Sequence, residues 1–436
     1  MQLDAGATPT YSDAFRVDEA FALDSDARDP LRSYRDQFLL PPGPDGQPLI
    51  YFCSHSLGLQ PKAVWPLMEQ ELANWAQLGV EGHFEGNYPW YTYQELLREP
   101  AASLLGARPE EVVFMNGLTV NLHLMMTTFY RPDPSRYKVL LDAPVFPSDL
   151  YAVKSQLRLH GLDPAQALLT LSPRKGEATL REEDIKRVLT EQGPQIALVL
   201  WSGVHFLSGQ YFDMAQLTSM AQQQGCVVGF DLSHAAGNVP LQLHDWQVDF
   251  AVWCNYKYLN SGPGAVAGCF VHERHGRNVA LPRLAGWWGN DPATRFRMQL
   301  EPEFLPQPGA DGWQISNPPI LALVPIRAAL ALYDEVGMAA LRAKSKALTG
   351  YLQFLVDHAG SKTLEVITPR DPEQRGCQLS LLARERPRDL LARLGEEGVT
   401  VDFREPNIIR VAPVPFYNTF HEVWRFRHIL DGLLGS

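Results

Sequence analysis

The sequence has 436 residues, of which 45% are hydrophobic and 20% are charged, a composition typical of a folded globular protein. Its formal net charge of −11, without a cluster of five or more lysines and arginines, argues against a nucleic-acid-binding surface. The length exceeds what one ordinary hydrophobic core supports, so we expect two domains.

Membrane and secretion signals are not found in the sequence. No apolar run approaches the length that spans a bilayer, and residues 1–32 lack the apolar stretch of a secretory signal. The five cysteines are scattered and form no Cys-x-x-Cys pair, which is typical of reduced thiols. We therefore expect a cytoplasmic protein that contacts neither membrane nor nucleic acid.

The N-terminal part of the chain gives weak structural signals. Residues 1–50 are rich in Pro, Asp and Gly and are expected to form an irregular arm. A helix is predicted over Ala63–Leu78, with an apolar stripe made by Trp65, Leu67, Leu72 and Trp75.

The middle of the chain alternates between apolar runs and amphipathic stretches. The runs are typical of buried parallel strands and cover Lys138–Asp142, Ile196–Trp201, Val227–Asp231 and Asp249–Cys254. The helical stretches between them include Leu150–His160, Glu182–Gln192 and Met214–Gln224. This alternation predicts a mostly parallel sheet flanked by helices.

The last part of the chain predicts a smaller α+β domain. A Pro/Gly-rich segment, Glu301–Pro319, and a helix pattern over Ile320–Glu335 precede it. Its helices are expected over Met338–His358, Pro387–Glu397 and Asn418–Leu434, and its strands over Leu364–Thr368, Cys377–Ala383, Val399–Phe403 and Ile408–Val411. The predicted fold class is α/β, with an arm (1–50), a large domain (51–330) and a small C-terminal domain (331–436).

An acid and a lysine stand at the ends of two consecutive apolar runs. Asp231 ends one run, and Lys257 lies near the end of the next, residues 248–258. In a parallel sheet both would project from strand ends into one crevice, where open α/β folds hold ligands. Pyridoxal phosphate requires a carboxylate for its pyridine nitrogen and a lysine for its Schiff base. The pair therefore indicates a pyridoxal-phosphate enzyme in which Lys257 later acts as a base.

Both residues also have a plain structural interpretation. A lysine at a strand end often reaches solvent, and an aspartate after a strand often caps a helix. His234 is a candidate cofactor contact, or it only packs against the core.

Groups for the phosphate and the ring are expected on neighbouring segments. Asn116-Gly117-Leu118-Thr119 opens a helix pattern that runs to Tyr130, and helix N-termini attract phosphate, although such a start is also an ordinary cap. Phe146, in Phe146-Pro147-Ser148-Asp149, is a candidate to stack on the ring or to pack as a loop aromatic. Ser202 and Tyr256 are further candidate hydroxyl donors.

Arg410 stands among apolar residues in Ile408–Val411. A buried arginine needs an anion, which is either the carboxylate of an amino-acid substrate or an internal salt-bridge partner. The sequence leaves both interpretations open.

Several longer strings of the sequence resemble kynureninase. They are Gly229-Phe230-Asp231-Leu232-Ser233-His234-Ala235, Asn255-Tyr256-Lys257-Tyr258-Leu259-Asn260, Gly286-Trp287-Trp288-Gly289, Ile315-Ser316-Asn317-Pro318-Pro319 and Ile409-Arg410-Val411-Ala412-Pro413-Val414-Pro415. Together with the strings at residues 116–123 and 146–149, the resemblance runs from about residue 50 to the C-terminus.

The resemblance implies a fold-type-I pyridoxal-phosphate enzyme of the class-V aminotransferase group, a homodimer with sites at its interface. The implied reaction is hydrolytic Cβ–Cγ cleavage of L-kynurenine to anthranilate and L-alanine. A class-V aminotransferase or a cysteine desulfurase on the same scaffold is the alternative.

The resemblance also implies a role for each candidate residue. Lys257 is the Schiff-base lysine, Asp231 the pyridinium partner and Arg410 the holder of the substrate carboxylate. The residues implied to surround the cofactor are Leu118, Thr119, Ser202, His234 and Tyr256, with Phe146 stacking and Asp149 nearby. Tyr256 is also a candidate acid/base.

Three further positions are matched to family residues that act across the dimer or select the substrate. Trp287 and Asn317 match residues that reach the phosphate or substrate from the partner chain. His83 and Asn317 resemble the animal-type members, in which these positions affect acceptance of 3-hydroxykynurenine. We therefore expect the enzyme to accept or prefer that substrate.

Overall fold

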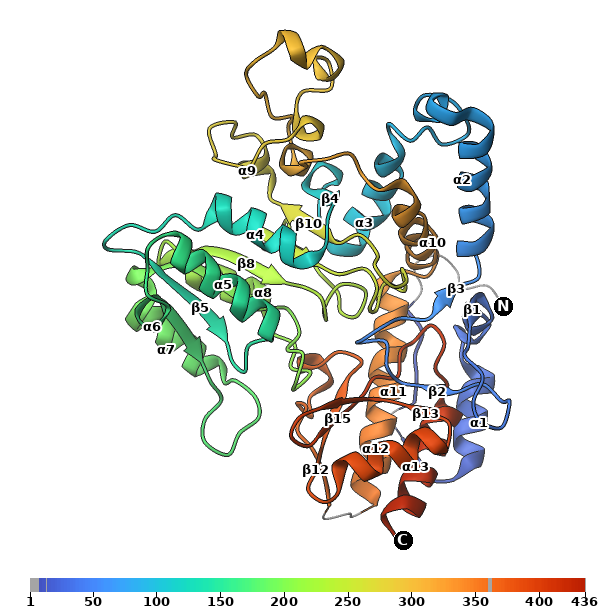
Figure 1. Ribbon diagram of the computed structural model, residues 1–436. Helices are drawn as coiled ribbons and strands as arrows, with labels where there is room; N and C mark the ends of the chain where they lie inside the picture. Colours follow the sequence, from blue (N-terminus) through green and yellow to red (C-terminus); the bar gives the residue numbers. More distant parts are fainter. Residues whose placement is uncertain (1–7, 13, 360–362, 436) are drawn as a thin grey trace.

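The computed structural model describes residues 8–12, 14–359 and 363–435, and its largest element is a seven-stranded sheet in the order β4-β10-β9-β8-β7-β5-β6 (Figure 1). Its strands are β4 (Val112–Phe114), β5 (Lys138–Asp142), β6 (Leu168–Leu171), β7 (Ile196–Ser202), β8 (Val227–Asp231), β9 (Phe250–Trp253) and β10 (Gly268–Val271). The neighbouring strands β9, β8, β7, β5 and β6 pair in parallel, whereas β10 is antiparallel to both β9 and β4. The sheet is therefore mostly parallel, as predicted.

Helices cover both faces of this sheet, because its strands are apolar on both sides. One face packs against α4 (Leu118–Phe129) and α5 (Pro147–Leu159), and the other against α7 (Glu182–Gln192) and α8 (Met214–Gln223). Successive strand residues point to opposite faces. In β9, Phe250 and Val252 join the core under α4, while Ala251 and Trp253 join the opposite core.

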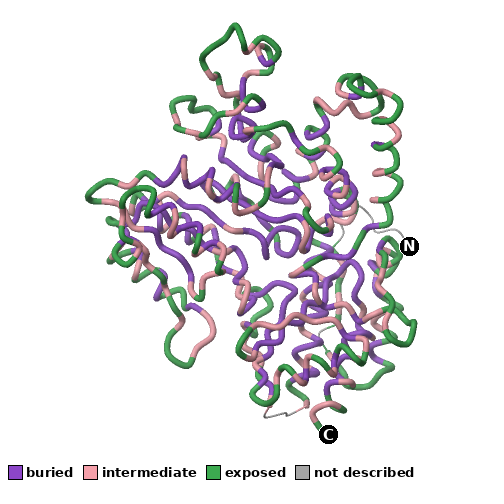
Figure 2. The backbone as a smooth tube through the Cα atoms, in the orientation of Figure 1, coloured by how far each residue is buried: buried purple, intermediate pink, exposed green. Residues whose placement is uncertain are grey.

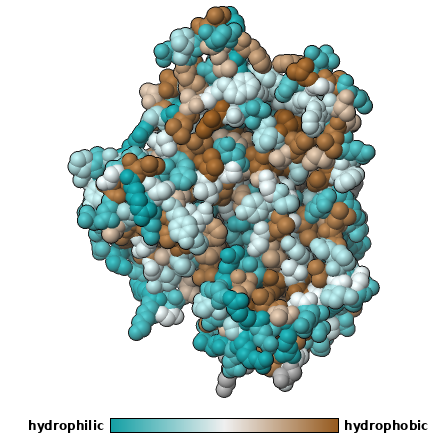
Figure 3. Space-filling model, viewed as in Figure 1, coloured by the Kyte–Doolittle hydropathy of each residue, from teal (hydrophilic) through white to brown (hydrophobic). Residues whose placement is uncertain are grey.

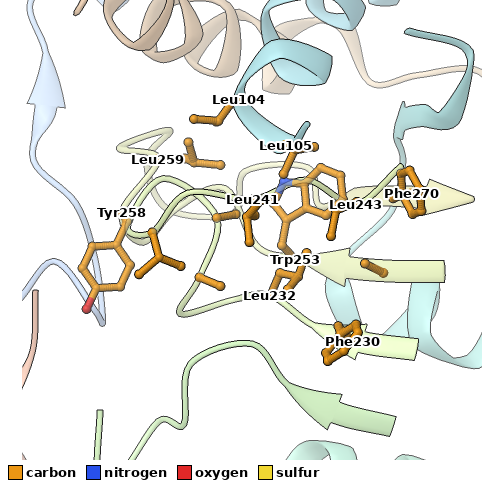
Figure 4. Packing of buried hydrophobic residues seen from close by; sticks show 14 of the residues in the cluster. Leu104, Leu105, Phe230, Leu232, Leu241, Leu243, Trp253, Tyr258, Leu259 and Phe270 are labelled. Carbon is orange, nitrogen blue, oxygen red and sulfur yellow. The ribbon is translucent and has the colours of Figure 1, made fainter. Parts of the chain in front are cut away.

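The second of these cores extends from the strands to the loops at their ends. Figure 4 shows Phe230, Trp253 and Phe270, from three adjacent strands, beneath the side chains of Leu104 and Leu105. These leucines end helix α3 (Arg98–Leu105). Burial of this apolar surface, at roughly 25 cal/mol per Å², holds rigid the loops that follow β8 and β9.

The C-terminal part forms a four-stranded antiparallel sheet in the order β11-β12-β15-β14. The strands are β11 (Leu364–Val366), β12 (Leu379–Ala383), β14 (Asp402–Arg404) and β15 (Ile408–Val411), and the helices are α11 (Met338–His358), α12 (Pro387–Glu396) and α13 (Phe420–Leu434). The predicted strand over 399–403 is wrong in one respect. It is divided, because its first residues form β13 (Val399–Thr400), which pairs with β2 (Ile50–Tyr51) in another sheet.

The N-terminal residues pack against this C-terminal part, so the expectation of an irregular arm is wrong. Helix α1 (Glu19–Arg28) lies against α13, and its Phe21 and Ala22 are buried in the same core as Leu348 and Leu352. Only these two residues of α1 are buried, which explains why the apolar pattern did not indicate a helix.

The remaining elements lie beside and above the large sheet in Figure 1. They include β1 (Phe38–Leu39), β3 (Gln60–Pro61), α2 (Val64–Leu78), α6 (Pro164–Ala167), α9 (Glu273–Gly276) and α10 (Ile320–Val336). None of the helices in the described ranges combines the length and the apolar run that a membrane crossing needs.

Helix α2 exposes the stripe that the sequence predicted to be its apolar face. Trp65 is 72% exposed and Trp75 is 60% exposed, and the helix is largely green in Figure 2 while the strands of the large sheet are purple. Figure 3 shows apolar side chains gathered in brown patches on the upper half of this face of the molecule. The helix itself is confirmed; Leu67 of the stripe packs partly buried against the core, whereas Trp65, Leu72 and Trp75 stay exposed among the described residues.

Candidate functional site

A cavity of about 140 Å³ lies at the carboxyl ends of the parallel strands. Leu118 and Thr119 reach it from the start of α4, Phe146 and Ser148 from the start of α5, and Ser202 from the end of β7. The remaining lining residues end β8 or follow β7, β8 or β9, and they are Val204, Phe206, Asp231, Ser233, His234, Tyr256 and Lys257.

Lys257 and Asp231 both line this cavity, as the strand pattern predicted. The Lys257 Nζ lies 3.2 Å from the His234 Nε2 and 5.8 Å from the centre of the Phe146 ring. Among the described residues Lys257 makes no ion pair. Its amine therefore faces the cavity without a carboxylate to hold it.

The backbone around Lys257 is fixed by a second segment of chain. The Gly58 N–H donates to the Tyr256 carbonyl at 2.8 Å, and a Cβ at Gly58 would lie 2.3 Å from the Lys257 carbonyl oxygen. Only glycine permits this approach, so the loop before α2 helps to set the position of the lysine.

Asp231 is one of two adjacent carboxyl groups. Its Oδ1 accepts from the Ser233 N–H at 2.8 Å, and both Asp231 and Asp149 line a small cavity beneath the main one. Burial raises the pKa of Asp149 well above its ordinary value, and the neighbouring Asp231 raises it further. Asp149 therefore holds its proton more strongly than an isolated carboxyl group.

The opposite end of the cavity offers donors for an anion. Helix α4 begins at Leu118, and no side chain caps its first turn, so its N–H groups are free for a ligand. The Thr119 and Ser148 hydroxyls lie 2.9 Å apart beside it. Ser148 was not among the predicted residues, although its place between Phe146 and Asp149 at the start of a helix was a usable signal.

The ionisable groups around the lysine are held in defined states. Burial lowers the pKa of His234 well below its ordinary value, and the charge of Lys257 lowers it further, so the imidazole is neutral. Burial raises the pKa of Tyr256, so its phenol stays protonated at neutral pH.

Arg410 lies behind the cavity wall and not on its surface. The guanidinium is fully buried, its Nε donates to the Asp402 Oδ2 at 2.5 Å, and its Nη1 donates to the carbonyl of Phe206 at 2.8 Å. Of the two interpretations that the sequence left open, the internal salt bridge is present. Phe206, whose carbonyl accepts this hydrogen bond, is itself a lining residue of the cavity.

Besides Asp149 and Arg410, three candidate residues lie outside the lining of the main cavity of this single chain. His83 ends the short helix η2 (Gly79–His83) and packs on the edge of Trp90, with ring centres 5.3 Å apart. Trp287, in η6 (Trp287–Gly289), and Asn317 are exposed. Val204, Phe206 and Ser233 line the cavity but were not predicted, because small or apolar loop residues carry no chemical signal.

Comparison with known sequences gives a consistent result. The family described as the kynureninase C-terminal domain matches residues 341–430. The chain is 56% identical over 418 residues to a kynureninase from Myxococcus xanthus, covering 96% of this chain and 98% of that protein. It is 54% identical over 413 residues to a kynureninase from Koribacter versatilis, covering 95% and 97%.

Solved structures with the same fold are more distant in sequence. The cysteine desulfurase CsdA from Escherichia coli superposes with a TM-score of 0.74 at 18% identity, covering 93% of this chain and 98% of that chain. A variant of C-DES with glycine covalently linked to its PLP cofactor superposes with a TM-score of 0.73 at 17% identity, covering 91% and 99%. At this identity the structures establish the fold, which is that of fold-type-I PLP enzymes. The near-full-length similarity to the curated relatives shows that the chain belongs to the kynureninase family.

Proposed function

We propose that this protein is a kynureninase that uses pyridoxal phosphate to hydrolyse L-kynurenine to anthranilate and L-alanine. The observation that carries the proposal is that Lys257 and Asp231 line one cavity at the strand ends of a chain from this family. The remaining residues of the cavity fit the same cofactor.

The cavity has the three groups that pyridoxal phosphate needs. Lys257 offers an amine without a carboxylate partner, and the Asp149–Asp231 pair offers a negative charge for a protonated pyridine nitrogen. The uncapped start of α4, with the Thr119 and Ser148 hydroxyls, offers donors for the phosphate. Leu118, Ser202, His234 and Tyr256 complete the enclosure, and Phe146 is the candidate to stack on the ring. When bound, the cofactor supplies an aldehyde carbon for amino groups and a ring that withdraws electrons from the substrate.

The chain's own groups then move the protons. The amine of Lys257, once displaced by the amine of the substrate, is the base at the substrate Cα. His234 is neutral and accepts a hydrogen bond from the lysine, which keeps the Nζ directed into the cavity. Tyr256 carries a proton that it can donate, so it suits the acid that protonates the alanine carbon after the C–C bond is broken.

We further propose that Arg410 binds the substrate carboxylate and that His83 and Asn317 contact the aromatic end. Asp402 contacts the Nε and Nη2 of Arg410, and the Phe206 carbonyl accepts from its Nη1, so a substrate carboxylate would replace one of these contacts. If His83 selects for 3-hydroxykynurenine, His83→Ala should change the ratio of kcat/KM for 3-hydroxykynurenine over kynurenine. An unchanged ratio would remove His83 from substrate recognition.

A homodimer with shared sites is the proposed assembly. His83, Trp287 and Asn317 lie outside the cavity of their own chain, and His83 lies close to the exposed apolar side chains of Trp75 and Phe84. A second copy that covers this surface would bring such residues to the neighbouring cavity. The free state of all five cysteines is consistent with the proposed cytoplasmic location.

The alternative of a cysteine desulfurase receives little support from the thiols. A desulfurase needs a reactive thiolate, but burial raises the pKa of each cysteine, to about 11 for both Cys53 and Cys377. None of the five lines the main cavity.

The function is tested by offering the cofactor-loaded protein L-kynurenine, L-cysteine, or L-alanine with a keto acid. Release of anthranilate from kynurenine, without sulfide from cysteine or amino-group transfer from alanine, is the expected result. Sulfide release or transamination as the fastest reaction would overturn the proposal.

A further inference from the structure

The turn at residues 204–211 follows β7 and forms part of the cavity wall. Its two ends pair with each other, and the His205 N–H donates to the Gln210 carbonyl at 2.8 Å. From the C-terminal part of the chain, the Gln378 amide donates to the Phe206 carbonyl at 3.1 Å. The turn is therefore held from two sides, and it forms a fixed base for the side chains that it carries.

His205 is buried in this turn and connects it to a second loop. It is 4% exposed, its Nδ1 lies 3.2 Å from the backbone nitrogen of Ser208, and its Nε2 lies 3.1 Å from the carbonyl oxygen of Pro144. Pro144 belongs to the short loop between β5 and α5, two residues before Phe146. The imidazole thus joins the backbones of two loops at the cavity.

Both ring nitrogens of His205 have defined roles. A carbonyl oxygen can only accept and a backbone N–H can only donate, so Nε2 carries the proton and donates to Pro144, while Nδ1 accepts from Ser208. Burial lowers the pKa of His205, although the nearby Asp142 opposes this shift, so the ring is neutral. In this one state the side chain satisfies both of its partners.

The loop that His205 holds carries the aromatic ring that faces the lysine. The centre of the Phe146 ring lies 5.8 Å from the Lys257 Nζ, and the Phe206 ring packs edge-on against Phe146 with ring centres 5.3 Å apart. The His205 ring lies 5.3 Å from the Phe206 ring in turn. The position of Phe146 in the cavity therefore depends on the turn through its ring and through its backbone.

We propose that His205 is a positioning residue for the cofactor, and that its hydrogen bond to the Pro144 carbonyl holds Phe146 where it stacks on the pyridine ring. This assignment rests on the proposed function, which makes Phe146 the stacking residue. His205 does not line the main cavity, so it acts through Phe146 and touches no reacting atom. Because aromatic stacking depends on the distance and tilt of the two rings, a loosened loop should weaken cofactor binding.

The test measures how firmly the cofactor is held, which requires no turnover. Equilibrium dialysis of the loaded protein gives the dissociation constant of pyridoxal phosphate, and circular dichroism in its visible absorption band reports the orientation of the ring. His205→Leu, which has no donor, and His205→Asn, whose amide is too short to reach Pro144, should raise the dissociation constant about 2- to 10-fold, the value of one neutral hydrogen bond, and weaken the dichroism. His205→Gln, whose amide N–H can replace the Nε2–H, should stay close to the wild type.

A second substitution shows whether the effect passes through the aromatic ring. In a Phe146→Leu background there is no ring to position, so adding His205→Leu should change the dissociation constant no further. A change of the same size in that background would overturn the assignment. An unchanged constant and unchanged dichroism in His205→Leu and His205→Asn would overturn it as well.

His272 provides a matched control at the opposite edge of the sheet. It is 3% exposed, its Nε2 lies 3.3 Å from the His244 carbonyl oxygen, and its Nδ1 accepts from the Arg274 N–H at 3.2 Å, so its bonding is like that of His205. It follows β10, which runs antiparallel to β9 and so ends away from the cavity.

His272→Leu should leave the dissociation constant and the dichroism unchanged, and thermal unfolding compares the stability of all variants. An effect on the cofactor as large as that of His205→Leu would mean general loosening of the fold and would overturn the assignment. Failure of the wild type to release anthranilate from kynurenine would instead overturn the proposed function and leave the cofactor measurements valid.

Discussion

At the scale of single residues, the site depends on carboxyl groups that act in pairs with other charges. Asp231 lies beside Asp149 and raises its pKa, and Asp402 forms an ion pair with Arg410. In both pairs burial makes an isolated charge unfavourable, so the charge state of each group depends on its partner.

Replacing Asp231 by alanine should abolish most turnover without unfolding the protein. At about 4 Å and an effective dielectric of about 20, a carboxylate stabilises a neighbouring cation by about 4 kcal/mol before desolvation, which corresponds to a roughly 1,000-fold loss of kcat. Initial rates of anthranilate release measure this, with thermal unfolding as the control. Activity close to that of the wild type would exclude Asp231 from the cofactor site.

Asp402 is predicted to position Arg410 and not to compete with the substrate. Asp402→Asn should raise KM about 10- to 100-fold with little change in kcat, because a hydrogen bond to a charged group contributes about 1.5–3 kcal/mol. Asp402→Glu should restore part of the affinity. A KM equal to or below that of the wild type would mean that Asp402 instead occupies the place of the substrate carboxylate.

At the scale of elements, strand ends position the chemistry, and one buried acid fixes two of these strands. The Asp249 carboxylate accepts from the Val228 N–H at 2.8 Å, from His275 at 2.7 Å and from Arg274 at 2.6 Å, and so joins β8, β9 and α9. Burial alone would raise the pKa of Asp249, but the hydrogen bond from His275 and the charge of Arg274 outweigh it and lower the pKa.

The stabilising effect of Asp249 should depend on pH with a defined sign. Because its pKa is lower in the folded than in the unfolded state, its contribution is complete above the unfolded value of about 4 and is lost as pH falls through the folded value. Asp249→Asn should cost about 1.5–3 kcal/mol at pH 7. Denaturant unfolding at pH 7 and below pH 4 should show this difference shrinking, whereas a difference independent of pH would contradict the assignment.

Strong apolar periodicity made several elements predictable from sequence. The strands β5, β8 and β15 and the helices α7 and α11 have the predicted bounds, because each combines a clear apolar pattern with a distinct end. The strands β4, β6 and β10 were missed. They are only three or four residues long, and their pairing with distant strands, not their local pattern, defines them.

The same limit applies to the site. Lys257, Asp231 and Thr119 follow apolar runs or open a helix, so their place at the cavity could be predicted. The contribution of the Cys53–Gly58 loop could not, because its contacts with Tyr256 and Arg410 join residues some 200 and 350 positions apart in sequence.

At the scale of the whole molecule, the exposed stripe of α2 indicates a missing partner. A stripe of tryptophans on a helix normally faces a core, and large exposed apolar patches mark interaction sites. Here Trp65 and Trp75 remain exposed in the single chain, which favours the proposed homodimer.

Trp75→Glu should therefore convert the dimer to a monomer. A charge buried in an apolar interface is strongly unfavourable, and loss of the shared site should lower activity with it. Analytical ultracentrifugation measures the assembly. Tyr151→Glu, which alters an exposed aromatic residue on α5, is the matched control and should remain dimeric. A dimeric and fully active Trp75→Glu variant would exclude α2 from the interface.

The central claim is that one amine, that of Lys257, holds the cofactor ring beside Asp231 in a single cavity. The most direct measurement is reduction of the cofactor-loaded protein with borohydride, which makes the link between amine and aldehyde carbon permanent, followed by mass-spectrometric peptide mapping. The added pyridoxyl mass should be found on the peptide that contains Lys257 and should be absent from Lys257→Ala. Its appearance on another lysine, or on none, would contradict the claim.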